Sequence, residues 1–333
     1  MWPAFALVTG LLLVGVVAEA DGLFATAGAQ LARIPVGPHT LLVVALALVA
    51  LVTAILNLDT SVFFLTPVML HLARERGIDE VPFLYGVVFM SNAASLFLPG
   101  SNLTNLIVLH PEHVAGATFF LRMWAAAAAA AVTTTLVLLA VFWRRLGEEH
   151  DGRDGDARAH FGVGAAAIAV ATVLVLVLSS PALPVLVVGV SAVLLAGTQR
   201  ARVLAAVDVR TLGLLFLLAC LLGGVGRWWN GPHAVLDSLG RWPTAAFGAG
   251  SAVLVNNLPA AVLLTPEPPQ HARALLLGLN LGPNLAVTGS LSAILWLRVA
   301  RSLDARPSVR TYSAIGLAVV PVSIVAALAA LSV

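Results

Sequence analysis

The sequence predicts an all-α polytopic membrane protein with inverted-topology repeats, two re-entrant hairpins and two broken transmembrane helices. Three observations predict this fold. Hydrophobic residues make up 60% of the 333 residues and charged residues only 10%, whereas a soluble domain carries roughly 25% charge. Apolar runs approaching the length of a spanning helix, about 20 residues, follow one another along the chain. Two stretches 199 residues apart share one polar pattern, which predicts a repeat.

The composition also excludes several classes of protein. An apolar content of 60% is incompatible with intrinsic disorder, and a net charge of +2 without a basic stripe argues against nucleic-acid binding. Metal-binding motifs of the CxxC and HExxH types do not occur, nor does a GxxxxGKS/T nucleotide loop. We therefore expect no catalytic residue, no metal site and no cofactor. Energy is expected from an ion gradient or from a separate ATPase subunit.

The apolar runs are the candidate membrane segments. Several are too short to cross a bilayer, or are interrupted by Asn, Gly and Pro at mid-depth. Irregular backbone at that depth is tolerated only against protein or a wet cavity, and short or broken segments are typical of transporter binding sites. The runs are 3–18, 39–56, 60–72, 83–109, 117–143, 161–178, 182–197, 211–226, 244–255, 258–265, 272–297 and 309–331.

Arginine placement predicts the orientation of the chain. All 18 basic residues are Arg, and 14 of them fall on one side of the predicted spans. The other four are Arg122, Arg227, Arg241 and Arg273. By the positive-inside rule the first side is cytoplasmic, provided that 55–72 and 254–265 belong to hairpins that return to the side they entered from. The protein is expected in the cell inner (plasma) membrane, with both termini on the extracytoplasmic side.

The repeat divides the chain into two halves. Residues 54–67 resemble 254–266, each with Asn at the tip and a Leu-Thr-Pro triplet beyond it. We expect a first repeat over 1–143 with a scaffold span, the first hairpin and a broken span, then a cytoplasmic linker over 144–160. The second repeat, 161–333, adds two scaffold spans before its own hairpin and broken span. Chance similarity between Leu- and Val-rich segments is the alternative explanation.

Asp59 is the main candidate for ion coupling, because it is the acid expected deepest in the apolar part of a hairpin. A charge at the bilayer centre costs at least ~2.5 kcal/mol on insertion scales, so such residues are rare without a function. Burial also favours the neutral form of a carboxyl, which suits proton coupling. The alternative is that Asp59 is the N-cap of a helix beginning at Thr60.

Amide side chains mark both predicted hairpin tips. Asn57 lies at the first tip, with Thr60 just beyond it, and Asn256 and Asn257 lie at the second. An amide offers both donors and acceptors, so we expect these residues to contact the substrate or ion. The alternative is that they satisfy backbone groups left free where a helix breaks.

The two predicted broken spans carry the remaining candidate site residues. Each set follows a Pro-Gly or Gly-Pro break, where a new helix N-terminus offers free N–H groups and partial positive charge. The alternative is a simple kink in which Ser and Thr bond back to the chain, and Ser91 and Asn92 are expected only to pack helices. The candidates are Ser101, Asn102, Thr104 and Asn105, then Asn284, Thr288, Gly289 and Ser290.

Four polar stretches carry a similarity to a known family. They are Leu56-Asn57-Leu58-Asp59-Thr60 with Leu65-Thr66-Pro67; Ala93-Ala94-Ser95-Leu96 with Ser101-Asn102-Leu103-Thr104-Asn105-Leu106; Asn256-Asn257-Leu258-Pro259; and Leu281-Gly282-Pro283-Asn284 with Thr288-Gly289-Ser290-Leu291. In this order they resemble the two hairpins and two broken spans of ArsB-type arsenite efflux permeases. The same ion transporter superfamily holds NhaD-like sodium/proton antiporters and dicarboxylate carriers.

The resemblance implies a secondary active transporter that expels arsenite and antimonite in exchange for protons. It allows for a homodimer and for an arsenite-stimulated ATPase subunit. Arsenic(III) prefers thiolates, but the single Cys220 cannot build a thiolate cage and is expected to be a small core residue. The substrate would then bind as its neutral hydroxide. The family usually has two further N-terminal scaffold spans, and either their absence or a wrongly chosen start codon would explain the difference. The chain also has Leu58 where the family often has Asn.

Three other functions fit the same sequence. A sodium/proton antiporter of this fold would show sodium-dependent activity, with the tip amides as cation ligands. An organic-anion carrier would need a cationic side chain in its binding site, and the sequence places no Arg deep in an apolar segment. A transport-inactive membrane subunit would not need to keep both polar tips.

Overall fold

The computed structural model describes residues 2–109, 115–147, 162–178, 180–197, 209–229 and 231–331. Within these residues every regular element is a helix, as the sequence predicts. In the first half they are α1 (Trp2–Ala20), α2 (Leu23–Ala32), α3 (Pro38–Ile55), α4 (Leu58–Glu75), α5 (Glu80–Ala94), η1 (Pro99–Ser101), α6 (Leu103–Leu109), α7 (Gly116–Phe142) and η2 (Arg145–Gly147). In the second half they are α8 (Val163–Val177), α9 (Ala182–Leu195), α11 (Val209–Trp228), α12 (Gly231–Asp237), α13 (Arg241–Val255), α14 (Asn257–Leu264), α15 (Ala272–Leu281), η4 (Gly282–Leu285), η5 (Val287–Gly289), α16 (Leu291–Ser302) and α17 (Val309–Ala330).

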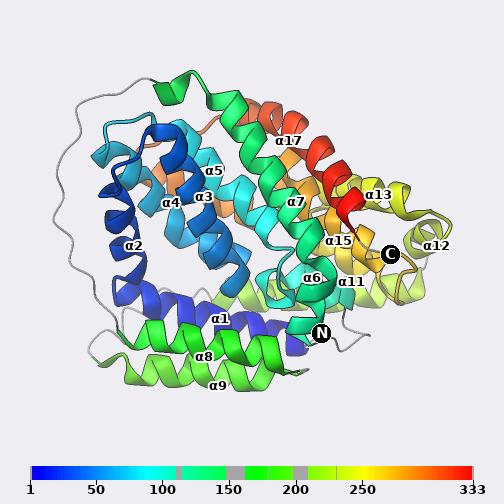
Figure 1. Cartoon of the computed structure of the whole chain (residues 1–333). Helices are drawn as coiled ribbons and strands as arrows, with labels where there is room; N and C mark the ends of the chain where they lie inside the picture. The colour runs from blue at the N-terminus through cyan, green and yellow to red at the C-terminus, as the bar shows by residue number, and fades with distance from the viewer. Residues whose placement is uncertain are drawn as a thin grey trace.

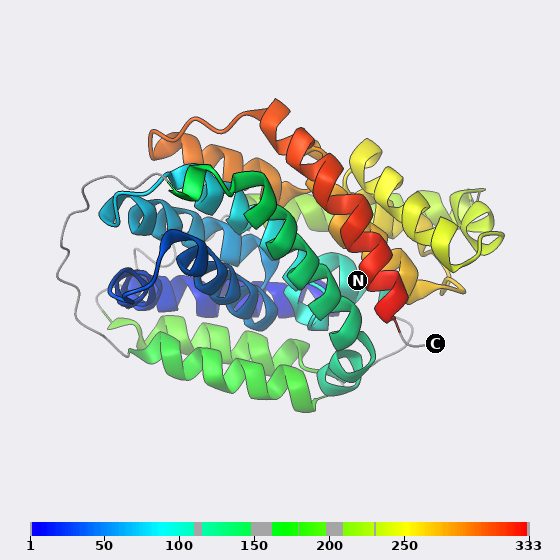
Figure 2. The same ribbon diagram turned by 45° about the horizontal axis from the view of Figure 1, so that its top comes forward.

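Four of the described helices, α1, α3, α7 and α17, are long and apolar enough to cross a membrane. The last helices of the two halves, α7 and α17, pack along each other (Figure 2). The hydroxyls of Thr134 and Ser323 lie 3.3 Å apart between them. Helix α17 also packs on η4, where a side chain on Gly316 would collide with the carbonyl oxygen of Asn284. The absence of a side chain therefore lets α17 approach the backbone of the second break.

Helices α1, α8 and α9 form a layer on one side of the molecule (Figure 1). Glycines bring their backbones close: a Cβ on Gly189 would lie 2.6 Å from the carbonyl oxygen of Gly10. Small residues at crossings are typical of membrane helix packing, which depends on close contact rather than on water exclusion. Asp21 accepts a hydrogen bond of 2.7 Å from the backbone N–H of Gly164, in the first turn of α8.

Corresponding helices of the two halves make corresponding contacts. Helix α3 packs on α5 as α13 packs on α15, and α2 packs on α4 as α12 packs on α14. Across the halves, α4 packs on α16 while α14 packs on α6. In each half, the helix that follows the polar tip therefore packs on the helix that follows the break in the other half.

Both predicted breaks are present. The run 83–109 is interrupted between α5 and α6, and the interruption begins at Ser95, before the Pro99-Gly100 pair predicted to cause it. The run 272–297 is interrupted by η4 and η5, immediately after Leu281 as the Gly282-Pro283 pair predicts. A Cβ on Gly289 would lie 2.7 Å from Cα of Pro283, so the backbone needs glycine there to fold back on itself.

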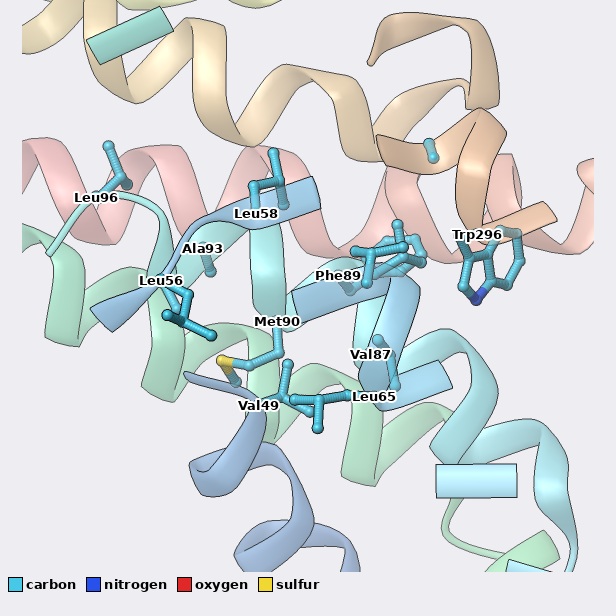
Figure 3. Close-up of a cluster of buried hydrophobic side chains, with 14 of the residues drawn as sticks. Val49, Leu56, Leu58, Leu65, Val87, Phe89, Met90, Ala93, Leu96 and Trp296 are labelled. Atoms are coloured by element: carbon cyan, nitrogen blue, oxygen red, sulfur yellow. The ribbon is translucent and has the colours of Figure 1, made fainter. Parts of the chain in front are cut away.

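The first tip is anchored by apolar side chains. Leu56 and Leu58, on either side of Asn57, belong to the same buried cluster as Phe89 and Met90 of α5 (Figure 3). Trp296 of α16 extends this cluster, and its indole N–H donates to the carbonyl oxygen of Leu84 at 2.8 Å. This packing fixes the direction of the polar side chains that begin α4.

Three arginines predicted on the cytoplasmic side tie loops and helix ends together. Arg74 forms an ion pair with Glu80 at 2.6 Å and donates to the carbonyl oxygen of Leu303 at 3.0 Å. Arg145 pairs with Asp79 at 3.0 Å. Arg76 donates to three carbonyl oxygens, those of Ala32, Ile34 and Val36. Arg74 therefore lies at the C-terminal end of α16. The assignment of this end to the cytoplasmic side of the membrane stays a prediction.

Two sequence expectations need comment here. Cys220 is exposed on α11, so the prediction of a small core residue is wrong. Of the predicted linker 144–160, the described part is 144–147, which includes the short helix η2. The rest of that linker lies outside the described residues.

Candidate functional site

The first tip is built around Asn57. Helix α3 ends at Ile55, Asn57 is extended, and α4 begins at Leu58. The Oδ1 atom of Asn57 accepts a hydrogen bond of 2.8 Å from the backbone N–H of Thr60. Asn57 is therefore the N-cap of α4. The alternative in which Asp59 caps the helix is wrong, because Asp59 lies within its first turn and its carboxylate is left for another contact.

Three consecutive residues of α4 point toward three different neighbours. The carboxylate of Asp59 accepts a hydrogen bond from Ser292 of α16. The methyl of Thr60 faces Gly15 of α1, where an added Cβ would collide with it. The hydroxyl of Ser61 forms a buried cluster with Thr53 of α3, at 2.7 Å, and Ser91 of α5, at 3.3 Å.

Two polar atoms at this tip have no hydrogen-bond partner among the described residues. They are Nδ2 of Asn57 and Oγ1 of Thr60, and both are buried. The Asn57 side chain is only 2% exposed. An unpaired buried donor costs about 1–3 kcal/mol, so each such atom calls for an explanation. One such explanation is a bound solute that supplies the missing hydrogen-bond partner.

The second tip differs from the first. Asn256 joins α13 to α14 with a φ of 76° and a ψ of 148°, a backbone conformation that is strained for residues other than glycine. Its Oδ1 accepts from the N–H of Leu258 at 3.3 Å, and its Nδ2 donates to the carbonyl oxygen of Thr288 at 3.0 Å. Asn257 begins α14 and is buried.

Both tips meet the same short segment, Thr288 to Ser292. Asn256 of the second tip binds the Thr288 carbonyl, and Asp59 of the first tip binds the Ser292 hydroxyl. Between these points Ser290 caps α16 by accepting from the N–H of Ala293 at 3.1 Å. The Asp59 carboxylate thus lies against the first turn of α16, where a helix carries partial positive charge.

The two breaks are joined through one amide, Asn280 of α15. Its Oδ1 accepts from Ser95 Oγ at 2.6 Å and from Asn102 Nδ2 at 2.7 Å. Its Nδ2 donates to Asn105 Oδ1 at 2.9 Å and to the carbonyl oxygen of Leu276 at 2.8 Å. All four hydrogen-bonding positions of this amide are filled.

The other polar residues of the breaks mostly hold the backbone. Ser101 donates to the carbonyl oxygens of Ser95 and Leu98, which is the back-bonding given above as the alternative. Asn102 accepts from the N–H of the buried Thr104 at 3.0 Å. Asn284 accepts from Asn92 Nδ2 at 2.8 Å, so Asn92 packs helices together as predicted, but across the two halves.

The predicted residues do not form one cluster. Asp59, Asn256, Thr288 and Ser290 lie where the tips meet the start of α16, whereas Asn57 caps α4 and Thr60 faces α1. Ser101, Asn102, Asn105 and Asn284 belong to the bracing of the breaks. Thr104 and Gly289 lie in the backbone of the two breaks, and Asn257 begins α14 and is buried. Sequence reasoning missed Ser292 and Asn280. The signal for Asn280 was its position as a lone amide in the apolar run Leu279-Asn280-Leu281.

The described part of the chain has no group of three or more His, Cys, Asp or Glu side chains that could hold a metal ion. A cavity of about 390 Å³ lies elsewhere, at the starts of α1 and α9 beside Pro99 and Leu106, and its lining is largely apolar. None of the ion pairs found in the described residues involves Asp59.

Comparisons with known proteins place this arrangement in a transporter family. The chain is similar to the crystal structure of the YdaH transporter of Alcanivorax borkumensis, with 15% sequence identity and a TM-score of 0.57. The alignment covers 99% of this chain and 84% of that one, and at this identity it shows the fold alone. No curated protein matches the sequence.

A family model gives the narrower assignment. Residues 1–287 match the model described as CitMHS, citrate transporter. The expected polytopic membrane transporter fold and membership of the ion transporter superfamily are thus confirmed. The narrower resemblance to arsenite permeases is not tested by these matches. Because the match spans most of its length, this chain belongs to the CitMHS citrate transporter family of secondary transporters.

Proposed function

We propose that this transporter expels arsenite, and antimonite, across the cell inner membrane in exchange for protons. Asp59 is the proton-coupling residue, and the solute binds where the two tips meet α16. The substrate and the coupling ion rest on the sequence resemblance and on the chemistry of this site. The family match supports the transporter class alone.

The chemistry of the site suits a neutral polyhydroxy solute. Asp59 contacts the hydroxyl of Ser292, and Asn256 of the second tip meets the same segment at Thr288. Asn57 and Thr60, which flank Asp59 in the sequence, carry buried polar atoms without a partner among the described residues. Arsenite near neutral pH is the uncharged hydroxide, which donates and accepts hydrogen bonds. Thiolate capture is disfavoured, because the sequence contains a single cysteine, Cys220, which cannot build a thiolate cage.

The observation that carries the proposal is the unfilled Nδ2 of Asn57. This donor is buried at the N-terminus of α4, two residues before Asp59, and lacks a partner among the described residues. A solute oxygen bound there would recover the cost of the unpaired donor, while a solute hydroxyl donates to the carboxylate. One solute with both groups satisfies both atoms.

Alternating access follows from the proposed topology. The pairs α3–α4 and α13–α14 are re-entrant hairpins from opposite faces, with their tips near the midplane, as in inverted-repeat transporters. The corresponding contacts of the two halves support this arrangement. Motion of the hairpins against the remaining helices would expose the site to each side in turn, with both termini outside the cell.

Citrate is the second candidate, and the family match over residues 1–287 favours it. The site argues against it on charge, because no ion pair in the described residues brings an arginine to Asp59. Citrate would have to enter with its own charge neutralised.

Homodimer formation and pairing with an ATPase subunit stay predictions.

Uptake into everted membrane vesicles containing the full chain tests the proposal. Radiolabelled arsenite and citrate are compared, each with and without an imposed proton gradient, against vesicles without the protein. The proposal expects gradient-dependent arsenite accumulation that excess antimonite inhibits. Accumulation of citrate but not arsenite would replace the proposed substrate with the second candidate.

A further inference from the structure

We infer that Ser292 is a positioning residue for transport, whose hydroxyl holds Asp59 when the site is empty and competes with the solute for that carboxylate. The inference rests on the proposed function and names a residue that neither the sequence pattern nor the family match assigns. It is carried by the contact between Asp59 and Ser292, by the freedom of the Ser292 hydroxyl, and by the unfilled donor of Asn57, two residues before Asp59.

The Ser292 side chain is only 2% exposed, and its hydroxyl donates to Oδ1 of Asp59. The partners are 233 residues apart in the sequence. This hydrogen bond therefore holds the first tip against α16. Because it ends on a carboxylate, it belongs to the stronger class of hydrogen bonds.

The hydroxyl of Ser292 has no other structural task. Ser290, not Ser292, caps α16. Buried hydroxyls elsewhere in the chain donate to the carbonyl one turn earlier, as Thr53 does to Val49 at 2.7 Å and Thr66 to Val62. Ser292 lies in the first turn of its helix, where no helical carbonyl precedes it. Its contact with Asp59 can therefore be exchanged without loss of a helix bond.

A solute that binds Asp59 has to take the place of Ser292. Its hydroxyl would donate to the carboxylate, and its oxygen would accept from the unfilled Nδ2 of Asn57. Binding then loosens the first tip from α16. In the release step the Ser292 hydroxyl returns to Asp59 and displaces the solute, so the same contact accelerates release.

Kinetics of Ser292→Ala test this competition, with Ser302→Ala as the matched control on the same helix. Ser302 is exposed and donates only to the carbonyl of Val299. Removal of the competitor should lower the apparent KM for arsenite about tenfold, the scale of one hydrogen bond to a charged group. The maximum rate should fall as well, because release slows. An unchanged or raised KM would overturn the inference.

A double-mutant cycle tests the contact without any substrate. Thermal unfolding midpoints of purified Ser292→Ala, Asp59→Ala and the double variant are compared with the unaltered protein. The inference expects the double variant to be shifted by clearly less than the two single shifts combined. Additive shifts would overturn it. If the unaltered protein moves no arsenite, the proposed substrate fails, while this cycle still decides whether Ser292 holds Asp59 when the site is empty.

Discussion

Asp59 at the first hairpin tip accepts a hydrogen bond from Ser292 in α16, although 233 residues separate them in the sequence. The second tip reaches the same segment through Asn256, which binds the carbonyl oxygen of Thr288. The start of α16 is thus the meeting point of both tips. A change at either tip can therefore be transmitted to the other through one short segment.

Replacement of Asn57 by Ser separates its two roles. Serine is as good an N-cap as asparagine, so α4 should keep its start and the unfolding midpoint should change little. Serine lacks the Nδ2 donor, so arsenite transport should fall at least tenfold. Asn57→Ala should lose both the cap, at about 0.5–2 kcal/mol, and transport. Full transport by a folded Asn57→Ser protein would remove this donor from the binding site.

Thr60→Val tests the second unfilled atom at the same tip. Valine keeps the methyl that packs against Gly15 and removes only Oγ1. If this hydroxyl contacts the solute, the apparent KM should rise several-fold while the unfolding midpoint holds or rises, because an unpaired buried polar atom has been removed. An unchanged KM would limit Thr60 to packing.

Asn280→Ala should destabilise the protein strongly. The substitution leaves Nδ2 of Asn102 and Oδ1 of Asn105 without a partner in a buried environment, while the Ser95 hydroxyl keeps only the carbonyl oxygen of Asn92. A loss of about 2–4 kcal/mol is expected, since interhelical hydrogen bonds in membranes average about 0.6 kcal/mol but orphaned groups cost more. Thermal unfolding in detergent measures it, with the exposed Gln30→Ala as control. A midpoint equal to that control would mean that Asn280 does not brace the breaks.

Gly316→Ala should impair folding through a clash rather than a lost contact. An alanine there would collide with the carbonyl oxygen of Asn284, so α17 would move away from the second break. Gly250→Ala is the matched control, because its Cβ would meet nothing within 4 Å and alanine favours a helix by about 1 kcal/mol. The yield of folded protein after detergent extraction should drop for Gly316→Ala only. Equal yields would contradict the close approach.

The sequence was informative about where the helices break but not about how the breaks are joined. Pro, Gly and Asn interrupt long apolar runs, and that local signal predicted both interruptions. Asn280 is different, because its side-chain partners lie 175 to 185 residues away and each is an ordinary polar residue in its own segment. Pairing across the two halves has no local signature.

At the first tip, too, the local sequence does not determine which side chain makes which contact. Both Asn57 and Asp59 are favoured N-caps, so residue type alone does not choose between them. Leu56 and Leu58 pack into the apolar cluster (Figure 3), and α4 begins at Leu58, two residues earlier than predicted. As a result, Asn57 is the N-cap of α4, and the carboxylate of Asp59 accepts a hydrogen bond from Ser292 instead.

The central claim is that Asp59 couples transport to protons, and Asp59→Asn in everted vesicles tests it most directly. Asp304→Asn is the matched control, an exposed acid at the end of α16 with a φ of 61° that Asn tolerates. The account predicts that Asp59→Asn abolishes gradient-driven arsenite accumulation in a folded protein, while Asp304→Asn keeps it. Gradient-driven accumulation at the unaltered level by Asp59→Asn would contradict the account.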